Sequence, residues 1–436
     1  QRHDNMAAIK GRDTKPEMIV RKYLWRCGFR YRVNSPRLPG HPDIVLRKYR
    51  TCIFVNGCFW HGHEGCRYYV VPKTHTDFWI KKVARNKERD RREQQQLARM
   101  GWHCITVWEC ELKKNKRERT LSSLAYTLNR IYLKDATARE EKKLERLKDR
   151  YGTHPSRRER QELERVEERV KALKNVQSTL DREQPSPQGD GTPRQLLSLE
   201  TSGKRVLAAV AQGNVDTADH IGVIVPGLYS NVANNLGKYD DDAKIMGANV
   251  RKHAHGESVA MISYLGYEAP QNIAEVTDIG YARRGADKLA GFLDGLDASR
   301  ERGAGDAHIT VASHSYGSTT AGIALTKVDS GVVDDLIQFG SPGSGVQDVS
   351  EFKLEKGHAW VSATDYWQDM VQGMGDDGRF GKNPAKMPGY NHLSGDVGDN
   401  VDKSQFYPFR KHGGYFNEGS KALDDISRVI AGRGKK

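Results

Sequence analysis

Cysteine is absent from most of this sequence. All six cysteines lie within the first 110 of 436 residues. The chain also starts without an apolar leader segment, and it contains no run of about 18 apolar residues, the length needed to cross a membrane. These absences argue against a disulfide-stapled secreted protein and against a membrane protein. They predict a cytoplasmic location, where clustered cysteine and histidine indicate a metal site rather than a disulfide.

Acidic residues are scarce in the first part of the chain only. Residues 1–134 hold 30 lysines and arginines against 12 aspartates and glutamates, a net charge of +18, and the remainder holds 40 against 44, a net charge of −4. A chain of 436 residues is too long for one ordinary core, so two domains are expected. The simplest interpretation is a first domain that binds a polyanion and a near-neutral second domain, with a merely solvated basic surface as the alternative.

Residues 1–134 are predicted to form a compact α/β domain, because short apolar runs alternate there with charged helical stretches. A Gly-His-Pro break separates the first helical stretch from the first strand. The expected elements are, in order, a helix at 14–28 capped by Thr14, a strand that begins at Asp43, a strand at 51–55, a helix at 81–100 and a strand at 104–108.

Residues 135–195 are predicted to be a helical hairpin or short coiled coil that ends in a linker. Ser156 and Glu159 form a capping box, and a Pro/Gly/Gln-rich stretch follows at 184–193. One apolar seam runs along a polar helix through Leu163, Val166, Val170, Leu173 and Leu180. The seam suits packing on either domain or on a second copy of the chain, so self-association through residues 157–180 is one expectation.

Residues 196–436 have the pattern of a parallel sheet with crossover helices. Apolar runs, mostly ended by glycine, alternate there with helical stretches. The strand-like runs lie at 221–227, 259–267, 308–313, 333–343 and 358–364.

The stretch NGCFWHGHEGC, with a later cysteine in VWEC, predicts a closed metal site. Cys58, His63 and Cys66 have loop-scale ligand spacing, and Cys110 completes a tetrahedral thiolate and imidazole set that suits structural zinc. Four protein ligands leave no open coordination position on the metal, so this zinc is expected to stabilise the fold. The other cysteines lie in apolar runs and are interpreted as small buried hydrophobic residues.

Several uncommon motifs occur together and in order over residues 4–134: RDTKPE, PGHPDIV, VNGCFWHGH, PKTHTDFW, NKERDRR and GWHCITVWEC. This part of the chain resembles the very-short-patch-repair (Vsr-type) DNA mismatch endonucleases. The resemblance implies a restriction-endonuclease-like α/β core with a structural zinc. It also implies an enzyme that uses magnesium to nick one strand of double-stranded DNA next to a T:G mismatch.

The residue chemistry agrees with that activity. Asp43, at the start of a strand, can hold Mg²⁺, and the resemblance adds the main-chain carbonyl of Val55 as a second ligand. His61 lies beyond the strand end and can deprotonate the attacking water, while Glu17 can reach in through a metal-bound water. Many family members carry a histidine where this chain has Asn56, which can bind a phosphate but cannot shuttle a proton near neutral pH.

Aromatic and basic residues complete the expected DNA interface. Phe59, Trp60 and Trp79 match positions where the family pushes aromatic side chains into the base stack, which costs least beside a mismatch. The alternative is that the two tryptophans belong to the core. Part of the basic run is expected to be solvated helix face and the rest to contact phosphates. The run comprises Lys81, Lys82, Arg85, Lys87, Arg89, Arg91 and Arg92.

The second domain carries a candidate nucleophile. HITVASHSYGSTTAG reads as a strand, a tight turn and a small-residue helix, with Ser315 in a G-x-S-x-G type elbow whose first glycine is replaced by serine. The acid and the histidine that act with Ser315 should follow it in the chain, the acid first and the histidine second. We favour Asp369 and His412, with Asp365 as the other acid and His392 as a competing histidine.

The main-chain N–H groups of Tyr316 and Leu228 are the expected oxyanion donors. Residues 200–432 resemble an actinobacterial α/β-hydrolase family of unknown function through VPGLYSN, SYLGYEAP, SHSYGS and FGSPG. This resemblance implies only attack on an ester, thioester or amide carbonyl.

Three functional hypotheses follow. The first is a mismatch-type nicking endonuclease that carries a serine-hydrolase-like second domain. The second is a serine hydrolase whose basic, zinc-braced first part only binds nucleic acid. The third is a zinc-stabilised binding protein without catalytic activity.

Overall fold

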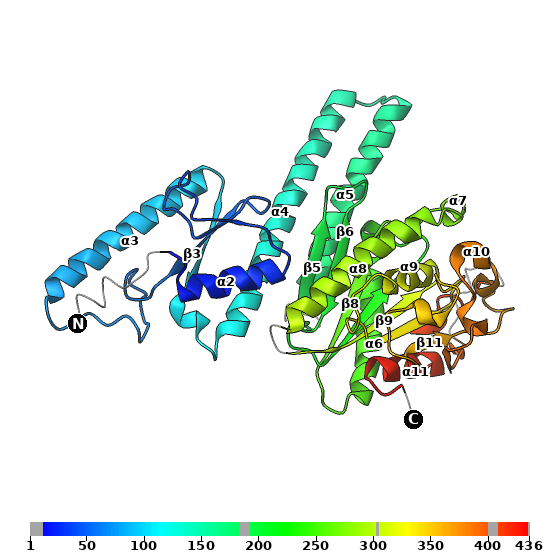
Figure 1. The fold of residues 1–436 in the computed structure, drawn as a ribbon. Coiled ribbons are helices and arrows are strands. Elements are labelled where there is room, and N and C mark those ends of the chain that lie inside the picture. Colours follow the sequence, from blue (N-terminus) through cyan, green and yellow to red (C-terminus); the bar gives the residue numbers. More distant parts are fainter. Residues whose placement is uncertain (1–11, 183–191, 302–304, 400–408, 435–436) are drawn as a thin grey trace. The chain divides into compact units, whose positions relative to one another are not determined.

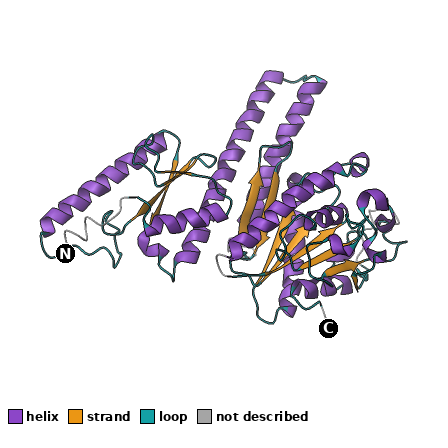
Figure 2. Cartoon of the chain, in the orientation of Figure 1, coloured by secondary structure: helices purple, strands orange, loops and turns teal. Residues whose placement is uncertain are grey.

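The computed structural model describes residues 12–182, 192–301, 305–399 and 409–434. The chain divides into two compact units, Gln1–Lys134 and Asp135–Lys436 (Figures 1 and 2). The helical hairpin that the sequence predicts between the two domains belongs to the second unit, and most of the predicted linker at 184–193 lies outside the described residues. Among the described helices, none combines the length and apolar character that a membrane crossing requires.

The first unit is built on a small mixed sheet with the order β1-β2-β3-β4. Strands β2 and β3 are antiparallel and β3 and β4 are parallel, so the carboxyl ends of β3 and β4 meet at one edge. The elements are α2 (Lys15–Arg26), β1 (Arg32–Val33), β2 (Ile44–Leu46), β3 (Thr51–Asn56), α3 (Thr76–Arg99), β4 (His103–Trp108) and a 3-10 turn (Glu109–Leu112).

The hydrophobic core of this unit accounts for the apolar positions in its helices and strands. Thr14 caps α2, as predicted, and the helix buries Val20 and Leu24 against Ile44 and Ile53 of the sheet. Helix α4 (Arg117–Tyr151) begins in this unit and contributes Leu121, Leu124 and Leu128 to the same core. The α/β fold expected for residues 1–134 is therefore confirmed.

Helix α3 begins earlier than predicted. The sequence predicted a start at residue 81, whereas the helix starts at Thr76, after His75 in the left-handed conformation. The sequence prediction missed the first turn because the segment HTDFW is largely polar. Asp77 lies in this turn, where its negative charge is favourable at the positive amino-terminal end of the helix dipole. As a result, Phe78 and Trp79 lie on a helix rather than in a loop.

The hairpin of α4 and α5 (Arg157–Asp181) packs into the second unit. The capping box is present, because Ser156 and Glu159 each accept a hydrogen bond from the other's main-chain N–H. Helix α5 packs on α6 (Val232–His253), and its seam is buried at Val166, Val170, Leu173, Val176 and Leu180. The seam is thus used inside the chain, which removes the reason to expect self-association through residues 157–180.

The second unit is an eight-stranded sheet with the order β12-β11-β10-β9-β7-β8-β6-β5. Strands β7 to β12 are parallel, and β6 runs antiparallel to both β5 and β8. The strands are β5 (Arg194–Glu200), β6 (Leu207–Gln212), β7 (His220–Val225), β8 (Val259–Leu265), β9 (His308–His314), β10 (Asp335–Phe339), β11 (Ala359–Ser362) and β12 (Asn391–Leu393).

Five of these strands match the predicted runs, and β5, β6 and β12 were missed. Strand β6 reads LAAVAQ, an alanine-rich run that is buried at every position and has no alternation to mark it as a strand. Strand β12 has only three residues, which is too short for a period. The expected parallel sheet is confirmed, and the antiparallel edge extends it.

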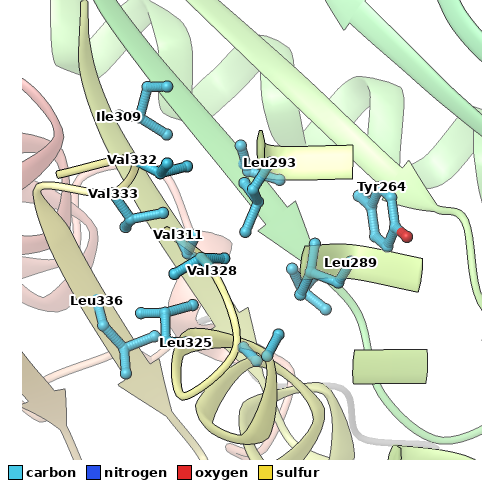
Figure 3. Close-up of a cluster of buried hydrophobic side chains, with 14 of the residues drawn as sticks. Tyr264, Leu289, Leu293, Ile309, Val311, Leu325, Val328, Val332, Val333 and Leu336 are labelled. Carbon is cyan, nitrogen blue, oxygen red and sulfur yellow. The ribbon is translucent and has the colours of Figure 1, made fainter. Parts of the chain in front are cut away.

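Helices flank the sheet and close its core. Helices α6 and α11 pack together, as do α8 and α9, and Figure 3 shows Leu289 and Leu293 of α8 beside Val311 of β9. The helices of this unit after α5 are α6 (Val232–His253), α7 (Ile273–Val276), α8 (Gly280–Glu301), α9 (Tyr316–Leu325), α10 (Asp377–Phe380) and α11 (Lys421–Ile430). The fully buried parallel strands make a rigid support for residues at their carboxyl ends.

Candidate functional sites

The four predicted metal ligands meet in the first unit. The ligand atoms of Cys58, His63, Cys66 and Cys110 all lie within 4.8 Å of one another. His63 Nδ1 is 3.5 Å from Cys58 Sγ and 3.4 Å from Cys110 Sγ, and the imidazole stacks on Trp108 at 4.1 Å. Burial raises the pKa of the Cys58 thiol to about 12, so a thiolate there requires a cation beside it. The donor set therefore fits one tetrahedral metal ion.

The predicted catalytic residues line one cleft of about 790 Å³. Asp43 directly precedes β2, which begins one residue later than predicted, Val55 lies on the neighbouring β3, Asn56 ends β3, and His61 follows in the loop that carries the metal ligands. The remaining lining residues are Thr14, Pro16, Glu17, Gly40, His41, Phe54, Gly57, Trp60, Arg89, Asp90, Glu93, Gln94 and Glu109. Asp43 and His61, which are 18 positions apart in the sequence, thus line the same cleft.

Asp43 is held by the neighbouring strand. Its Oδ2 accepts a hydrogen bond of 2.7 Å from the Val55 N–H. Burial raises the pKa of Asp43 to about 6, although this hydrogen bond acts in the opposite direction. The environment leaves the Asp43 carboxylate short of compensating positive charge, which favours a cation in the cleft.

His61 has a partner that the sequence did not predict. Its Nδ1 lies 2.5 Å from Oδ2 of Asp90, which projects from α3. Burial raises the pKa of Asp90, but the hydrogen bond and charge of His61 and Arg89 outweigh burial and hold that pKa below its ordinary value. An ionised carboxylate can only accept, so His61 Nδ1 carries a proton, and Nε2 is the nitrogen that can act as a base when the ring is neutral.

Glu17 lies at the cleft but is more constrained than expected. Its Oε2 accepts hydrogen bonds from Arg21 at 2.8 Å and from the main-chain N–H of Asp13, and its Oε1 accepts from Thr14. Arg21 also reaches the Asp43 carbonyl at 3.5 Å. Glu17 therefore anchors the first turn of α2 beside Asp43, and any role on the metal must run through water. Asn56 is buried at the cleft wall.

The predicted aromatic residues form one cluster. The ring of Phe59 lies 5.2 Å from Trp60 and 5.4 Å from Trp79, and the two tryptophans are 6.0 Å apart. Phe78, which the sequence did not single out, stacks edge-on against Trp79 at 5.1 Å and is 58% exposed. Because the cluster is only partly buried, it is a surface feature at the start of α3 and not part of the core.

The basic run on α3 divides into paired and unpaired residues. Lys87 pairs with Glu64, and Arg91 pairs with Glu88 at 3.0 Å. Within the described part of the chain, Lys81, Lys82 and Arg85 form no ion pair and are exposed within two turns after Trp79. Those three are consequently the cations best placed for phosphates beside the aromatic cluster.

In the second unit, Ser315 occupies a strained turn between β9 and α9. Its backbone has φ 56° and ψ −133°, a conformation that non-glycine residues rarely adopt. The turn packs tightly on the β7 loop: a side chain at Gly227 would lie 2.7 Å from both the Ser315 Cβ and the Tyr316 N atom, and one at Gly317 would meet the Val225 carbonyl at 2.4 Å. Such geometry is typical of a nucleophile elbow.

Asp369 and His412 form the acid–histidine pair. Asp369 Oδ1 accepts a hydrogen bond of 2.9 Å from His412 Nδ1, and Tyr415 donates to the other oxygen at 3.4 Å. Asp369 is fully buried; burial raises its pKa, but the His412 interactions outweigh this and leave the pKa below its ordinary value. Asp369 and not Asp365 is bonded to His412, since Asp365 is exposed, and His392 is an exposed residue of β12.

The acid–histidine pair and the elbow both lie beside the carboxyl end of β10. Ser315 N donates to the Phe339 carbonyl at 3.1 Å, and the next residue, Gly340, has φ 56°. A side chain at Gly340 would lie 3.1 Å from the His412 ring and 3.2 Å from Asp369 Oδ2, so only glycine lets the pair approach the elbow this closely.

His314, which sequence reasoning missed, ties His412 to the elbow. Burial lowers the pKa of His314 to about 3, so the ring is neutral, and its Nε2–H donates to the His412 carbonyl at 2.7 Å. The two rings are in contact and tilted by 35°, with centroids 4.5 Å apart. The expected oxyanion donors are also adjacent, because Leu228 follows Gly227 and the Tyr316 N atom faces Gly227.

The folds and sites define a hydrolase of two units, one of nuclease type and one of α/β-hydrolase type. The family model of the DNA mismatch endonuclease Vsr matches residues 1–67, and the model described as alpha/beta hydrolase matches residues 202–375. The chain is 51% identical over 108 residues to a type II nicking enzyme from Neisseria meningitidis, an overlap of 25% of this chain and 76% of that protein.

Two further relatives match the chain, one over the first unit and one over the second. The DNA mismatch endonuclease Vsr of Escherichia coli is 44% identical over 116 residues, 27% of this chain and 74% of that protein. An uncharacterized protein of Mycobacterium tuberculosis is 34% identical over 216 residues, 48% of this chain and 79% of that protein. The chain belongs to the DNA mismatch endonuclease Vsr family through its first unit, and an α/β-hydrolase domain follows in the same chain.

Proposed function

We propose that the first unit nicks one strand of double-stranded DNA next to a T:G mismatch, with Mg²⁺ as cofactor. The observation that carries this proposal is the single cleft that contains Asp43, Val55, Asn56 and His61 beside an exposed aromatic cluster. Mg²⁺, when bound by Asp43 and the Val55 carbonyl, would supply positive charge for the phosphate. Carboxylate and carbonyl oxygens are the donors this ion prefers, and burial of Asp43 favours a cation.

The chain's own residues account for the remaining steps. His61 Nε2 takes the proton of the attacking water, and Asp90 holds the imidazole in that tautomer and stabilises its positive charge. The Asn56 amide donates a hydrogen bond to a phosphate oxygen. Water's oxygen forms a bond to phosphorus while the bond to the 3′ sugar oxygen breaks, so one strand is cut. His61 is therefore the one imidazole base in this mechanism.

The aromatic cluster supplies mismatch preference. A ring of Phe59, Trp60 or Trp79 inserted between bases costs a few kcal/mol of stacking, and this cost is lowest where pairing is already weak. In a test with 5′-labelled duplexes that differ only in one T:G or T:A pair, we expect the T:G duplex to be cut at least about 100-fold faster, on one strand only. Equal cutting of the two duplexes, or tight binding without cutting, would contradict this proposal.

Phosphate binding gives a separate prediction. Replacing Lys81, Lys82 and Arg85 together by glutamine should weaken binding to all duplexes and reduce the slope of log K against log salt by about 0.9 for each phosphate that is no longer neutralised. The measurement is fluorescence anisotropy between low and moderate salt. The matched control is Arg91→Gln on the same helix, because Arg91 is paired with Glu88. An unchanged slope in the triple variant would argue against a role for these cations at the phosphates.

We also propose that the metal held by Cys58, His63, Cys66 and Cys110 is structural zinc. Three thiolates and an imidazole suit zinc in a closed tetrahedral site. Cys110→Ser should abolish stoichiometric zinc and lower the melting temperature of the first unit, because the ligand joins the loop to the end of β4. Cys104→Ser, a cysteine outside the cluster, is the control. For both variants, mass spectrometry measures the zinc content and a thermal melt measures the melting temperature.

A second activity is favoured by the strained Ser315 and the Asp369–His412 pair. We propose a serine hydrolase in which Ser315 Oγ attacks an acyl carbonyl and His412 takes its proton. The bond from the carbonyl carbon to the leaving oxygen, sulfur or nitrogen then breaks, and His412 returns the proton to the leaving group. Water, deprotonated by His412, releases the acid. The N–H groups of Tyr316 and Leu228 would stabilise the oxyanion.

A further inference from the structure

The large apolar side chains that are exposed in the described part of the second unit lie on segments that follow the carboxyl ends of β7, β8 and β11. Among the described residues of this unit, the large apolar side chains that are exposed belong to Tyr229, Ile273, Tyr366, Trp367 and Met374. All lie on segments that carry or contact the Ser315 site, although the unit extends over residues 135–436. We call these five residues the apolar rim. The carboxyl ends of these parallel strands lie at one edge of the sheet, where exposed apolar side chains suit a binding surface better than single scattered ones do.

Tyr229 ties the rim to the oxyanion segment. It follows Leu228 directly, it is 52% exposed, and its N–H donates to the Pro270 carbonyl at 2.8 Å. Its φ of 64° places a bulky aromatic residue in the left-handed region, where the backbone is strained. Strain of this kind is concentrated at functional sites, and here it presents an apolar ring beside the proposed oxyanion donors.

Trp367 and Met374 flank the acid of the site. Asp369 caps a 3-10 turn (Met370–Gly373), with Trp367 two residues before it and Met374 directly after the turn. Both side chains are about two-thirds exposed, at 65% and 63%. The Gln368 carbonyl accepts a hydrogen bond of 3.3 Å from the N–H of Lys411, the residue before His412. The rim on this side is therefore attached to both members of the acid–histidine pair.

Ile273 approaches from a third segment. It lies on α7, one turn before Val276, which packs in the cluster around Tyr316. Tyr316 Oη also donates to the Asp278 carbonyl at 3.0 Å, so α7 and the loop after it are fixed to the residue beside Ser315. Three separate segments with exposed apolar side chains are thus each attached to residues of the Ser315 site.

This inference rests on the proposed serine hydrolase function. We infer that the apolar rim binds the hydrocarbon chain of an ester whose carbonyl lies at Ser315, so that the second unit prefers medium- and long-chain acyl esters to acetyl esters. The segments that carry the rim also carry or contact the catalytic residues, which a separate protein-docking surface would not require. Aromatic and thioether side chains also adapt well to a flexible hydrocarbon chain. Each methylene removed from water can add up to about fourfold to kcat/KM.

The test is a series of p-nitrophenyl esters from acetate to decanoate, each below its micelle concentration, on the full chain. For the wild-type protein, we expect kcat/KM to rise at least about tenfold from acetate to decanoate. In Trp367→Ser, the decanoate-to-acetate ratio of kcat/KM should fall about three- to tenfold, mainly through KM. Tyr229→Ser should lower the same ratio. Trp25→Ser removes an exposed tryptophan from the first unit and should leave the ratio unchanged.

The outcomes separate this inference from the function on which it rests. If Ser315 reacts with a fluorophosphonate and acetate is hydrolysed, but the wild-type rates do not rise with chain length, the inference is wrong and the hydrolase function stands. A Trp367→Ser variant that slows all esters equally would also overturn it, as would one that changes only the sedimentation of the chain, because the rim would then cover a second copy. If no ester is hydrolysed and Ser315 is not labelled, both proposals fail.

Discussion

Asp43→Asn is expected to reduce mismatch-dependent nicking by about a thousandfold or more. The substitution removes the negative charge that would hold the cation, while the amide oxygen can still accept the hydrogen bond from the Val55 N–H. The fold should therefore persist, and the loss should appear in the rate of cutting and not in DNA binding. A single-turnover assay on a T:G duplex measures the rate, and fluorescence anisotropy measures binding.

Asp149→Asn is the matched control for this experiment, because Asp149 is an exposed aspartate on the helical hairpin outside the cleft. It should cut at the wild-type rate. If Asp43→Asn kept a tenth of the wild-type rate at saturating Mg²⁺, the proposed role of Asp43 would be wrong. Asp90→Asn should cause a smaller loss, since it leaves His61 in place but removes the carboxylate that fixes its tautomer.

Ser315→Ala is expected to remove ester hydrolysis by about 10⁴-fold or more, because no other group in the site can form the acyl intermediate. It should also abolish labelling by a fluorophosphonate. The adjacent contacts with Gly227 and Gly317 do not involve the Ser315 hydroxyl, so the packing of the elbow should survive. Ser178→Ala, an exposed serine on α5, is the control and should keep full labelling.

The two large effects should be independent of each other. Ser315→Ala should nick a T:G duplex at the wild-type rate, and Asp43→Asn should hydrolyse esters normally. A loss of nicking in Ser315→Ala would contradict the assignment of the two reactions to separate units. Labelling that persists in Ser315→Ala would show that the nucleophile is another residue. In either case the disagreement would identify which unit was assigned wrongly.

Local patterns were sufficient for much of this site. The spacing of Cys58, His63 and Cys66 restricts the ligands to one loop, and the structure brings Cys110 to the same point at the end of β4. The small residues around Ser315 predict a turn in which a helix approaches a strand closely, and the backbone shows that turn. Such features depend on neighbours in the chain, which is why sequence alone can indicate them.

Other features depend on contacts between distant segments. Asp90 lies in a basic helix that reads as solvated surface, and only the packing of α3 against the metal loop turns it toward His61. The only available signal was one aspartate in the run NKERDRR. The same holds for His314, whose contact with the His412 carbonyl joins residues 98 positions apart.

The amino-acid order alone indicated the two units, the metal ligands and the nucleophile, because short-range spacing and small-residue turns encode them. The tertiary structure pairs Asp369 with His412, whereas Asp365, Asp369, His392 and His412 look alike until burial and distance separate them. It also decided that the α5 seam is buried inside the chain and that the aromatic cluster is partly exposed. The physical reason is that burial and hydrogen-bond distance belong to the folded chain and leave no trace in local spacing.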